Sequence, residues 1–448
     1  MQQGYLCFEG IECVYSRLDD GLIVTPKNES DIRTMFQYCH KTNFFLEYQN
    51  RIYKKSVAYV KQIIPRGDNS FRFVTKYNVA LIGEYNVTGF TITGDDIDVF
   101  FSPSKYFFRK KSAGESLDTD LLYDKIKADD FIFTYSEKRI TATLYYGNIL
   151  EKGIASDLKI HPHLRVEFDS TSNINFIFGL YETIVKFLKL VRYQQNINLK
   201  PIELFGPTET HDKSILGIMY SNIYITKDYR KTSDSEYEIF KPYINQILQL
   251  VSDDQDFSIR HFPLSEDDSY KYDVQRYLSI FASFEYECNK NSEEYLQQND
   301  ELLRSVKNDL LNCIQALKKN TANDIERTFL DNARNRISQL GTQYGQEKKI
   351  INAYYKIEDI FKESITFLFP HGFKIKELAS RLSKLRAKIA HDNLYRELTD
   401  EEARDIRFME VLSYIMLLKR AGLKDETIEL VIGAVFHCNF KYMDFYKN

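Results

Sequence analysis

The sequence predicts an α+β protein. A β-rich N-terminal domain over residues 1–265, sheet- or sandwich-like with flanking helices, precedes an all-α helical bundle over residues 270–448. Runs rich in β-branched and aromatic residues, punctuated by glycine, occupy much of residues 79–168. Apolar residues at helical spacing, with almost no glycine or proline, dominate the second part. Polar, breaker-rich segments at 252–256 and 263–269 bracket the expected boundary.

The strands of the first part are expected where β-branched and aromatic residues cluster or alternate with polar ones. Residues 131–135 and 139–146 predict a hairpin that turns around Ser136. Further strands are expected at 79–93, 97–101 and 164–168, with a turn at residues 94–96. Strands at this spacing are typical of a twisted antiparallel sheet, a sandwich or an open barrel.

Helices are expected wherever apolar residues recur every three to four positions. In the first part, residues 28–40 and 49–62 predict short helices and residues 176–193 a longer one, and residues 206–214 predict a loop. In the second part, helices are expected at 273–289, 292–318, 323–340, 347–368, 374–391, 400–420 and 425–438.

The composition is that of an ordinary globular protein with a formal net charge of −4, so any nucleic-acid site must be a local basic patch. The six cysteines are scattered without a CxxC pair, which indicates free thiols in a reducing cytoplasm. The N-terminus lacks the pattern of a signal peptide. No apolar run approaches about 18 residues, so no membrane partner is expected.

Motifs for several enzyme classes are absent from the sequence. It contains no GxxxxGK[ST] phosphate loop, GxGxxG, HExxH or GxSxG. His161 and His163 invite a metal site, but no nearby cysteine or carboxylate has ligand spacing, and a loop leading into a strand is the better interpretation. We therefore expect neither a metal nor another cofactor.

Arg386 and His391 lie near the end of an amphipathic helix and are followed by Asp392 and Asn393, a polar pair suited to ending it. An imidazole can transfer a proton near neutral pH, and a guanidinium can neutralise a phosphate as it gains charge. Together they suit metal-free RNA cleavage. The alternative is that both residues cap the helix and interact with its dipole.

The helix itself does not bring the two side chains together. Its apolar stripe is Leu378, Leu382, Leu385 and Ile389. Arg386 and His391 are five positions apart, so their faces differ by about 140°. Either the helix ends at His391 and the long Arg386 side chain bends toward it, or a second copy of the chain completes the site.

Residues 381–393 resemble the signature helix of HEPN domains, helical domains whose ribonuclease members carry Arg-x4–6-His, and the similarity extends over about residues 270–448. Residues 81–85 and 160–168, with the helix that follows, resemble the β-rich front of ApeA-type phage-defence proteins. This resemblance implies a cytoplasmic, toxic endoribonuclease that works as a homodimer and aborts infection. The implied substrate is transfer RNA, with the anticodon loop as the cleavage site, and the front domain would sense a phage-derived protein trigger.

The implied mechanism is metal-independent. His391 would assist attack of the RNA 2′-OH on the adjacent phosphate or protonate the leaving 5′-oxygen, and Arg386 would hold the phosphorane. HEPN folds also place an acidic residue of the first helix near the site, for which Glu285 is preferred over Glu287. The alternative for either carboxylate is an exposed acid on an amphipathic helix.

Four further residues would bind RNA. Lys384 and Lys388 share a helix face with His391, Arg381 lies nearby, and Asn393 follows the helix.

The motif departs from the family at one position. Many HEPN nucleases carry a polar residue directly after the arginine, where this chain has Ala387. This residue favours a second hypothesis, in which the helical domain binds RNA or a protein partner, or dimerises, without cleaving RNA.

Overall fold

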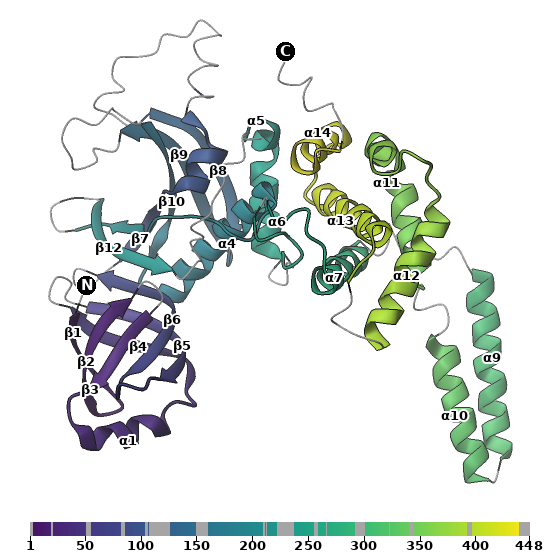
Figure 1. Cartoon of the computed structure of the whole chain (residues 1–448), viewed down its shortest axis with the longest axis horizontal. Coiled ribbons are helices and arrows are strands. Elements are labelled where there is room, and N and C mark those ends of the chain that lie inside the picture. The colour runs from purple at the N-terminus through teal and green to yellow at the C-terminus, as the bar shows by residue number, and fades with distance from the viewer. Residues whose placement is uncertain are drawn as a thin grey trace, which may run out of the picture. The chain divides into compact units, whose positions relative to one another are not determined.

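In the computed structural model the chain divides into two compact units (Figure 1). The first comprises Met1–Phe257 and Pro263–Asp268, and the second Ser258–Phe262 and Ser269–Asn448. The first is β-rich and the second all-helical, which confirms the predicted α+β class. The structure describes residues 3–18, 21–50, 55–81, 86–103, 106, 126–148, 160–208, 211, 213–221, 237–254, 259–265, 267–291, 301–321, 323–339, 345–391 and 397–438.

A closed antiparallel barrel forms the start of the first unit. Its strands, in the order β3-β2-β1-β4-β5-β6, are closed by pairing of β3 with β6. Alternate side chains point inward and form a core that includes Leu6, Phe8 and Phe73. The bounds are β1 (Gln3–Phe8), β2 (Ile11–Leu18), β3 (Gly21–Pro26), β4 (Thr42–Asn50), β5 (Lys55–Pro65) and β6 (Phe71–Leu81).

The predicted short helix at residues 28–40 is confirmed as α1 (Glu29–Gln37), but the one at 49–62 is wrong. Those residues belong mainly to β4 and β5. The β5 strand shifts register twice against β6, around Val60. Its core-facing Ala58, Val60 and Ile63 therefore depart from strict alternation, and together with buried Val57 they give a spacing of three that mimics a helix in the sequence.

The sheet continues from β6 in the order β12-β11-β7-β10-β9-β8. The predicted hairpin is confirmed as β8 and β9, with left-handed backbone at Ser136 and Glu137 (φ 47° and 64°). The bounds are β7 (Val87–Ile92), β8 (Ile126–Tyr135), β9 (Lys138–Asn148), β10 (Ile160–Thr171), β11 (Ile202–Gly206) and β12 (Ser214–Ser221). The predicted strand at 164–168 thus lies within β10, and the predicted loop at 206–214 joins β11 to β12.

Helix α4 (Ile174–Arg192), predicted at 176–193, packs on this sheet, with the rings of Phe178 and Tyr77 4.3 Å apart. The predicted strand at 97–101 is wrong, because α2 (Asp95–Phe100) occupies those residues. Asp96 in its first turn is buried against Arg192 at 3.2 Å, which anchors the helix to α4. The unit also contains α5 (Tyr237–Phe240), a 3₁₀ turn (Lys241–Tyr243) and α6 (Ile244–Asp253).

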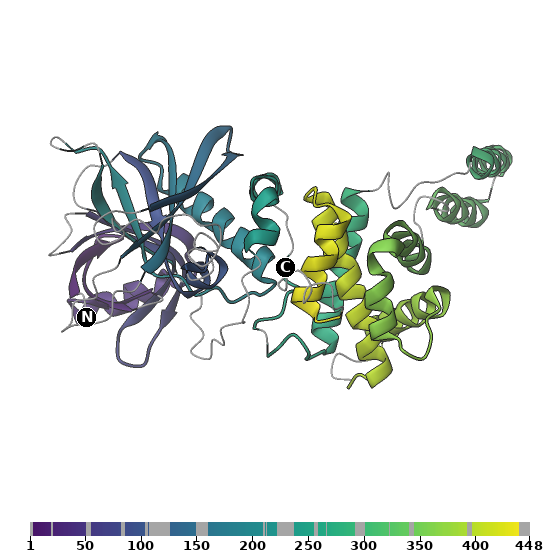
Figure 2. The same cartoon turned by 90° about the horizontal axis from the view of Figure 1, so that it is seen from above.

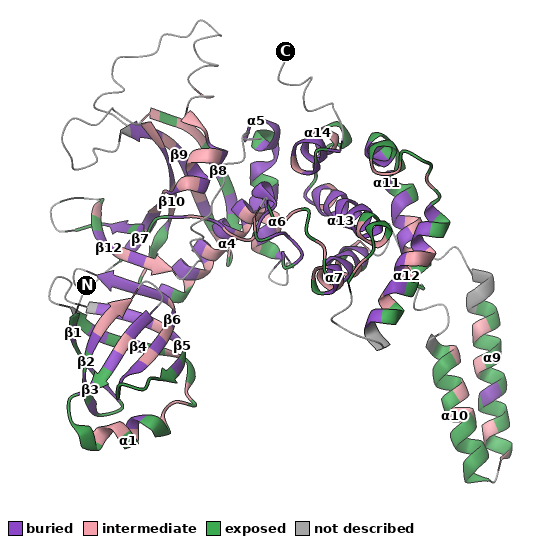
Figure 3. Ribbon diagram, in the orientation of Figure 1, coloured by how far each residue is buried: buried purple, intermediate pink, exposed green. Residues whose placement is uncertain are grey.

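The helical unit follows the prediction closely. Its helices are α7 (Val274–Lys290), α9 (Glu301–Asn320), α10 (Asp324–Gln339), α11 (Gln346–Leu368), α12 (Ile375–His391), α13 (Asp400–Arg420) and α14 (Asp425–Phe436). Residues 292–300, the start of one predicted helix, lie outside the described residues. Helix α13 is central: residues 405–418 are all buried (Figure 3). It lies alongside α7 and also contacts α11, α12 and α14 (Figures 1 and 2).

Candidate active site

Helix α12 carries the Arg386 to His391 motif and packs by its predicted stripe. Leu378, Leu382, Leu385 and Ile389 are at most 5% exposed, which confirms this prediction. Burial of such a stripe fixes the rotation of the helix about its axis. Lys384, Ala387 and Lys388 lie off this stripe and are exposed.

The Arg386 side chain lies between α12 and α7. Its Nη2 is 3.4 Å from Glu285 Oε2, and the guanidinium carbon is 4.9 Å from the centre of the Phe281 ring. The Arg386 side chain is nevertheless 43% exposed and that of Glu285 26%. A guanidinium has five donors in a fixed plane, so one carboxylate contact leaves donors for a solvent-side anion such as a phosphate.

A second contact holds the other oxygen of Glu285. Gln346, the first residue of α11, donates from Nε2 to Glu285 Oε1. Gln346 Oε1 is buried and accepts no hydrogen bond from the described residues. The Glu285 carboxylate is thus fixed between Gln346 and Arg386. No sequence signal marked Gln346, because only the fold brings it to a residue 61 positions away.

Glu287, the other carboxylate considered for the site, does not lie beside Arg386. It is 3% exposed and accepts two hydrogen bonds of 2.8 Å from Arg420 on α13. Residues two apart on a helix point about 200° apart. Glu287 therefore ties α7 to α13, and only Glu285 lies beside Arg386.

Tyr277, two turns before Glu285, joins α7 to the motif helix. Its hydroxyl donates to the Leu382 carbonyl at 2.8 Å. Burial raises the pKa of Tyr277 well above its ordinary value, with a smaller opposing effect from the Arg386 charge. The hydroxyl therefore stays protonated and remains a donor at neutral pH.

Arg381, which is expected to bind RNA, contacts carboxylates of α13. Its guanidinium makes a two-pronged contact with Asp405 on α13, at 2.7 and 2.8 Å, and Glu401 lies 3.4 Å away. The hydrogen bond to Asp405 raises the pKa of Arg381. Two carboxylates offset this charge, so we leave Arg381 out of the proposed RNA surface and assign it to the α12–α13 contact.

The remaining predicted residues are only partly described. His391 is the last residue of α12, but its side chain lies outside the described part of the structure, as does all of Asn393. Lys384 and Lys388, one turn apart and exposed, form a small basic face on the same helix.

His161 and His163, the two histidines considered as metal ligands, lie within β10 itself rather than in a loop leading into it. His161 Nδ1 is 2.8 Å from Asp98 Oδ2, and His163 is 8% exposed. Within the described ranges, no group of three or more His, Cys, Asp or Glu side chains could hold a metal ion.

No protein-family model, curated protein or solved structure matches this chain. Among the described helices, none is both long and apolar enough to cross a membrane.

Proposed function

We propose that the chain is a metal-independent endoribonuclease of the HEPN type, with Arg386 and His391 as its catalytic residues. The observation that carries the proposal is the placement of Arg386. It is half-exposed on a well-packed helix, and a carboxylate of the expected helix, Glu285, lies 3.4 Å away. Arg420 differs in this respect, because its side chain is only 12% exposed in its pair with Glu287.

The proposed chemistry begins with the RNA phosphate on the exposed edge of Arg386. The adjacent 2′-OH attacks phosphorus, the bond to the 5′-oxygen breaks, and His391 moves a proton in one of these steps. Arg386 stabilises the extra negative charge of the phosphorane. Glu285 is a positioning residue that holds the guanidinium. The products are a 2′,3′-cyclic phosphate and a 5′-hydroxyl.

Two copies of the chain are part of this proposal. Arg386 and His391 project about 140° apart on a straight helix, so one phosphate does not easily reach both on one chain. A two-fold dimer would set the Arg386 of one copy against the His391 of the other. Lys384 and Lys388 would contact neighbouring phosphates.

In the cell, the substrate we propose is transfer RNA, cut in an unpaired loop where the 2′-OH can align with its phosphate. The enzyme would act in the cytoplasm as the toxic effector of phage defence. The β-rich unit would respond to a phage-derived protein. The resemblance described above supports these assignments.

The test is incubation of the purified chain with total transfer RNA in EDTA, followed by analysis of the fragment ends. Cyclic phosphate and 5′-hydroxyl ends are expected, and a substrate with 2′-O-methyl groups in its loops should stay intact. Fragments with 5′-phosphate ends, or cleavage that needs added magnesium, would contradict the mechanism.

Ala387 favours a second function, a non-catalytic adaptor that binds RNA or a protein. This residue is exposed beside Arg386 and offers no hydrogen bond. An adaptor should bind transfer RNA without cutting it, with and without extract from phage-infected cells, and its overexpression should leave growth unchanged.

A further inference from the structure

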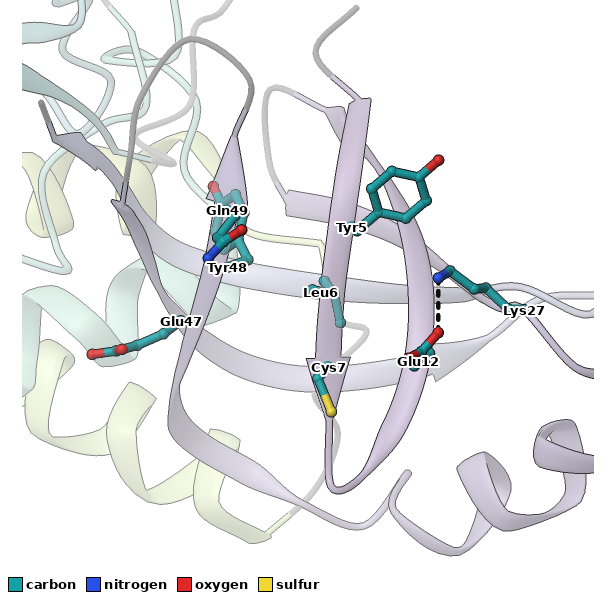
Figure 4. A pocket seen from close by; sticks show the side chains of 8 residues that line it. All are labelled: Tyr5, Leu6, Cys7, Glu12, Lys27, Glu47, Tyr48 and Gln49. Carbon is teal, nitrogen blue, oxygen red and sulfur yellow. Dashed lines mark hydrogen bonds and ion pairs between the residues drawn. The ribbon is translucent and has the colours of Figure 1, made fainter.

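The wall of the barrel is split between β1 and β4. These strands pair at two positions, Gly4 with Asn50 and Tyr5 with Gln49. Below them the strands diverge, although residues 6–8 and 46–48 all belong to the described chain (Figure 4). A cleft of about 560 Å³ opens there, lined by Tyr5, Leu6, Cys7, Glu12, Lys27, Glu47, Tyr48 and Gln49.

Aromatic side chains keep the two strands apart. The Tyr15 hydroxyl donates to the Gln49 carbonyl at 3.0 Å, and its ring packs edge-to-face on Tyr48 with centroids 4.7 Å apart. The Tyr48 hydroxyl donates to Asn78 Oδ1 on β6. Because Tyr15 and Tyr48 are at most 5% exposed, closing the cleft would displace rings from the barrel core. The opening is therefore built into the packing.

The cleft presents two strand edges. On its other side, β1 pairs with β2 along its whole length, and β4 pairs with β5 from Thr42 to Tyr48. On the side that faces the cleft, residues 6–8 of β1 pair with no strand of the described chain. Such an edge is a row of backbone N–H and C=O groups with side chains alternating at about 3.4 Å per residue, and an extended backbone matches it best.

The side chains around the cleft also alternate in character. Leu6 and Tyr48 point into the barrel, while Cys7 is exposed. On the rim, Lys27 lies 2.8 Å from Glu12 and 4.8 Å from the centre of the Tyr5 ring. An occupant with alternating apolar and polar side chains would meet an apolar floor and a polar rim.

We propose that this cleft binds an extended peptide segment of a protein partner, which pairs as an added strand with β1. Backbone hydrogen bonds would supply affinity, and alternate side chains facing Leu6 and Tyr48 would supply selectivity. The proposal does not depend on the ribonuclease activity. If both hold, it identifies where a protein trigger would bind.

The test uses a displayed library of random short peptides, selected on the full chain. The strongest binder is then synthesised with one N-methyl group at each position in turn. Methylation at alternate positions should weaken binding by at least about tenfold, because each removes a backbone donor facing β1. Methylation at the intervening positions, whose N–H groups point away from β1, should weaken binding less. Uniform tolerance of N-methylation would contradict strand addition.

Two variants of Cys7 locate the binding. Cys7→Trp places a large ring in the cleft and should abolish binding of the selected peptide, whereas Cys7→Ser should bind it as the wild type does. Both changes are at an exposed position, and thermal unfolding should confirm the fold. The proposal would be overturned if the selected peptide still binds the Cys7→Trp variant, or if every peptide from the selection does. A dimer that Cys7→Trp disrupts would show that a second copy occupies the cleft instead.

Discussion

At the scale of single residues, Arg386 acts through its shape as well as its charge. Its plane lies near the Phe281 ring while one edge meets Glu285. Arg386→Lys keeps the charge but loses the planar fork, so cleavage of transfer RNA should fall about 100-fold. Because the pair is half-exposed, the free energy of unfolding should change by less than ~1 kcal/mol. Initial rates and urea unfolding measure both effects, and unchanged cleavage would remove Arg386 from the mechanism.

Gln346 is expected to position Glu285. Gln346→Leu has nearly the same shape and removes the hydrogen bond to the carboxylate, so kcat should fall about tenfold with KM nearly unchanged. The effect should disappear in a Glu285→Gln background, because the two residues act through one contact. Steady-state rates of the single and double variants decide this. Additive losses would show that Gln346 acts independently of Glu285.

Tyr277 gives the helical unit a dependence on alkaline pH. Burial raises its pKa above the ordinary 10.0, so the folded chain keeps this proton after the unfolded chain has lost it. Its contribution to stability is therefore complete below about pH 10 and is lost as the pH rises further. Tyr277→Phe should lower the free energy of unfolding at pH 7 by about 1 kcal/mol, through the lost bond to Leu382.

As the pH rises above 10, the free energy of unfolding of the wild type should fall toward that of Tyr277→Phe, because phenylalanine does not titrate. Urea unfolding of wild type and Tyr277→Phe across this range isolates Tyr277 from the other buried tyrosines. Parallel curves would mean that the hydroxyl is free to ionise in the fold.

At the scale of elements, the contact between α12 and α13 rests on Arg381 and Asp405. The Asp405 side chain is 2% exposed, so Arg381→Ala would leave a buried carboxylate without its main partner. We expect a loss of about 2 kcal/mol in the free energy of unfolding, largely recovered by Arg381→Ala with Asp405→Ala. Urea unfolding measures this, and RNA affinity should change less than in Lys384→Ala. If Arg381→Ala weakens RNA binding more than Lys384→Ala does, Arg381 belongs to the RNA surface.

The helices were predictable because each has its own local signal. Most of the runs from α7 to α14 are amphipathic, and all are nearly free of glycine and proline. Helix α13 is buried on all sides over residues 405–418, and its local signal is the Thr399–Glu402 capping box at its start. The barrel was not predictable from local patterns, because its closure depends on pairing of β3 with β6, about 50 residues apart. Register shifts in β5 also gave that strand a helical spacing of apolar residues.

The candidate site was likewise predictable only where a local sequence pattern marks its residues. Arg386 and Glu285 were identified from the sequence, and the structure places them together. Gln346 and Phe281 were missed, because tertiary packing alone brings them to Arg386. Arg381 pairs with Asp405, and Glu287 pairs with Arg420, both on α13. No local sequence pattern reveals these two contacts.

At the scale of the whole molecule, the chain has a β-rich unit with a cleft between two strands and a helical unit with a candidate ribonuclease site. The central claim is that Arg386 and His391 cut RNA without a metal ion. The most direct measurement compares wild type, Arg386→Ala, His391→Ala and the double variant on total transfer RNA in EDTA, with and without extract from phage-infected cells. Lys376→Ala, an exposed cation on the same helix, is the matched control.

Discrete fragments from wild type and Lys376→Ala are predicted, with none from the other three variants. Cleavage that survives in the variant lacking both Arg386 and His391 would contradict the account.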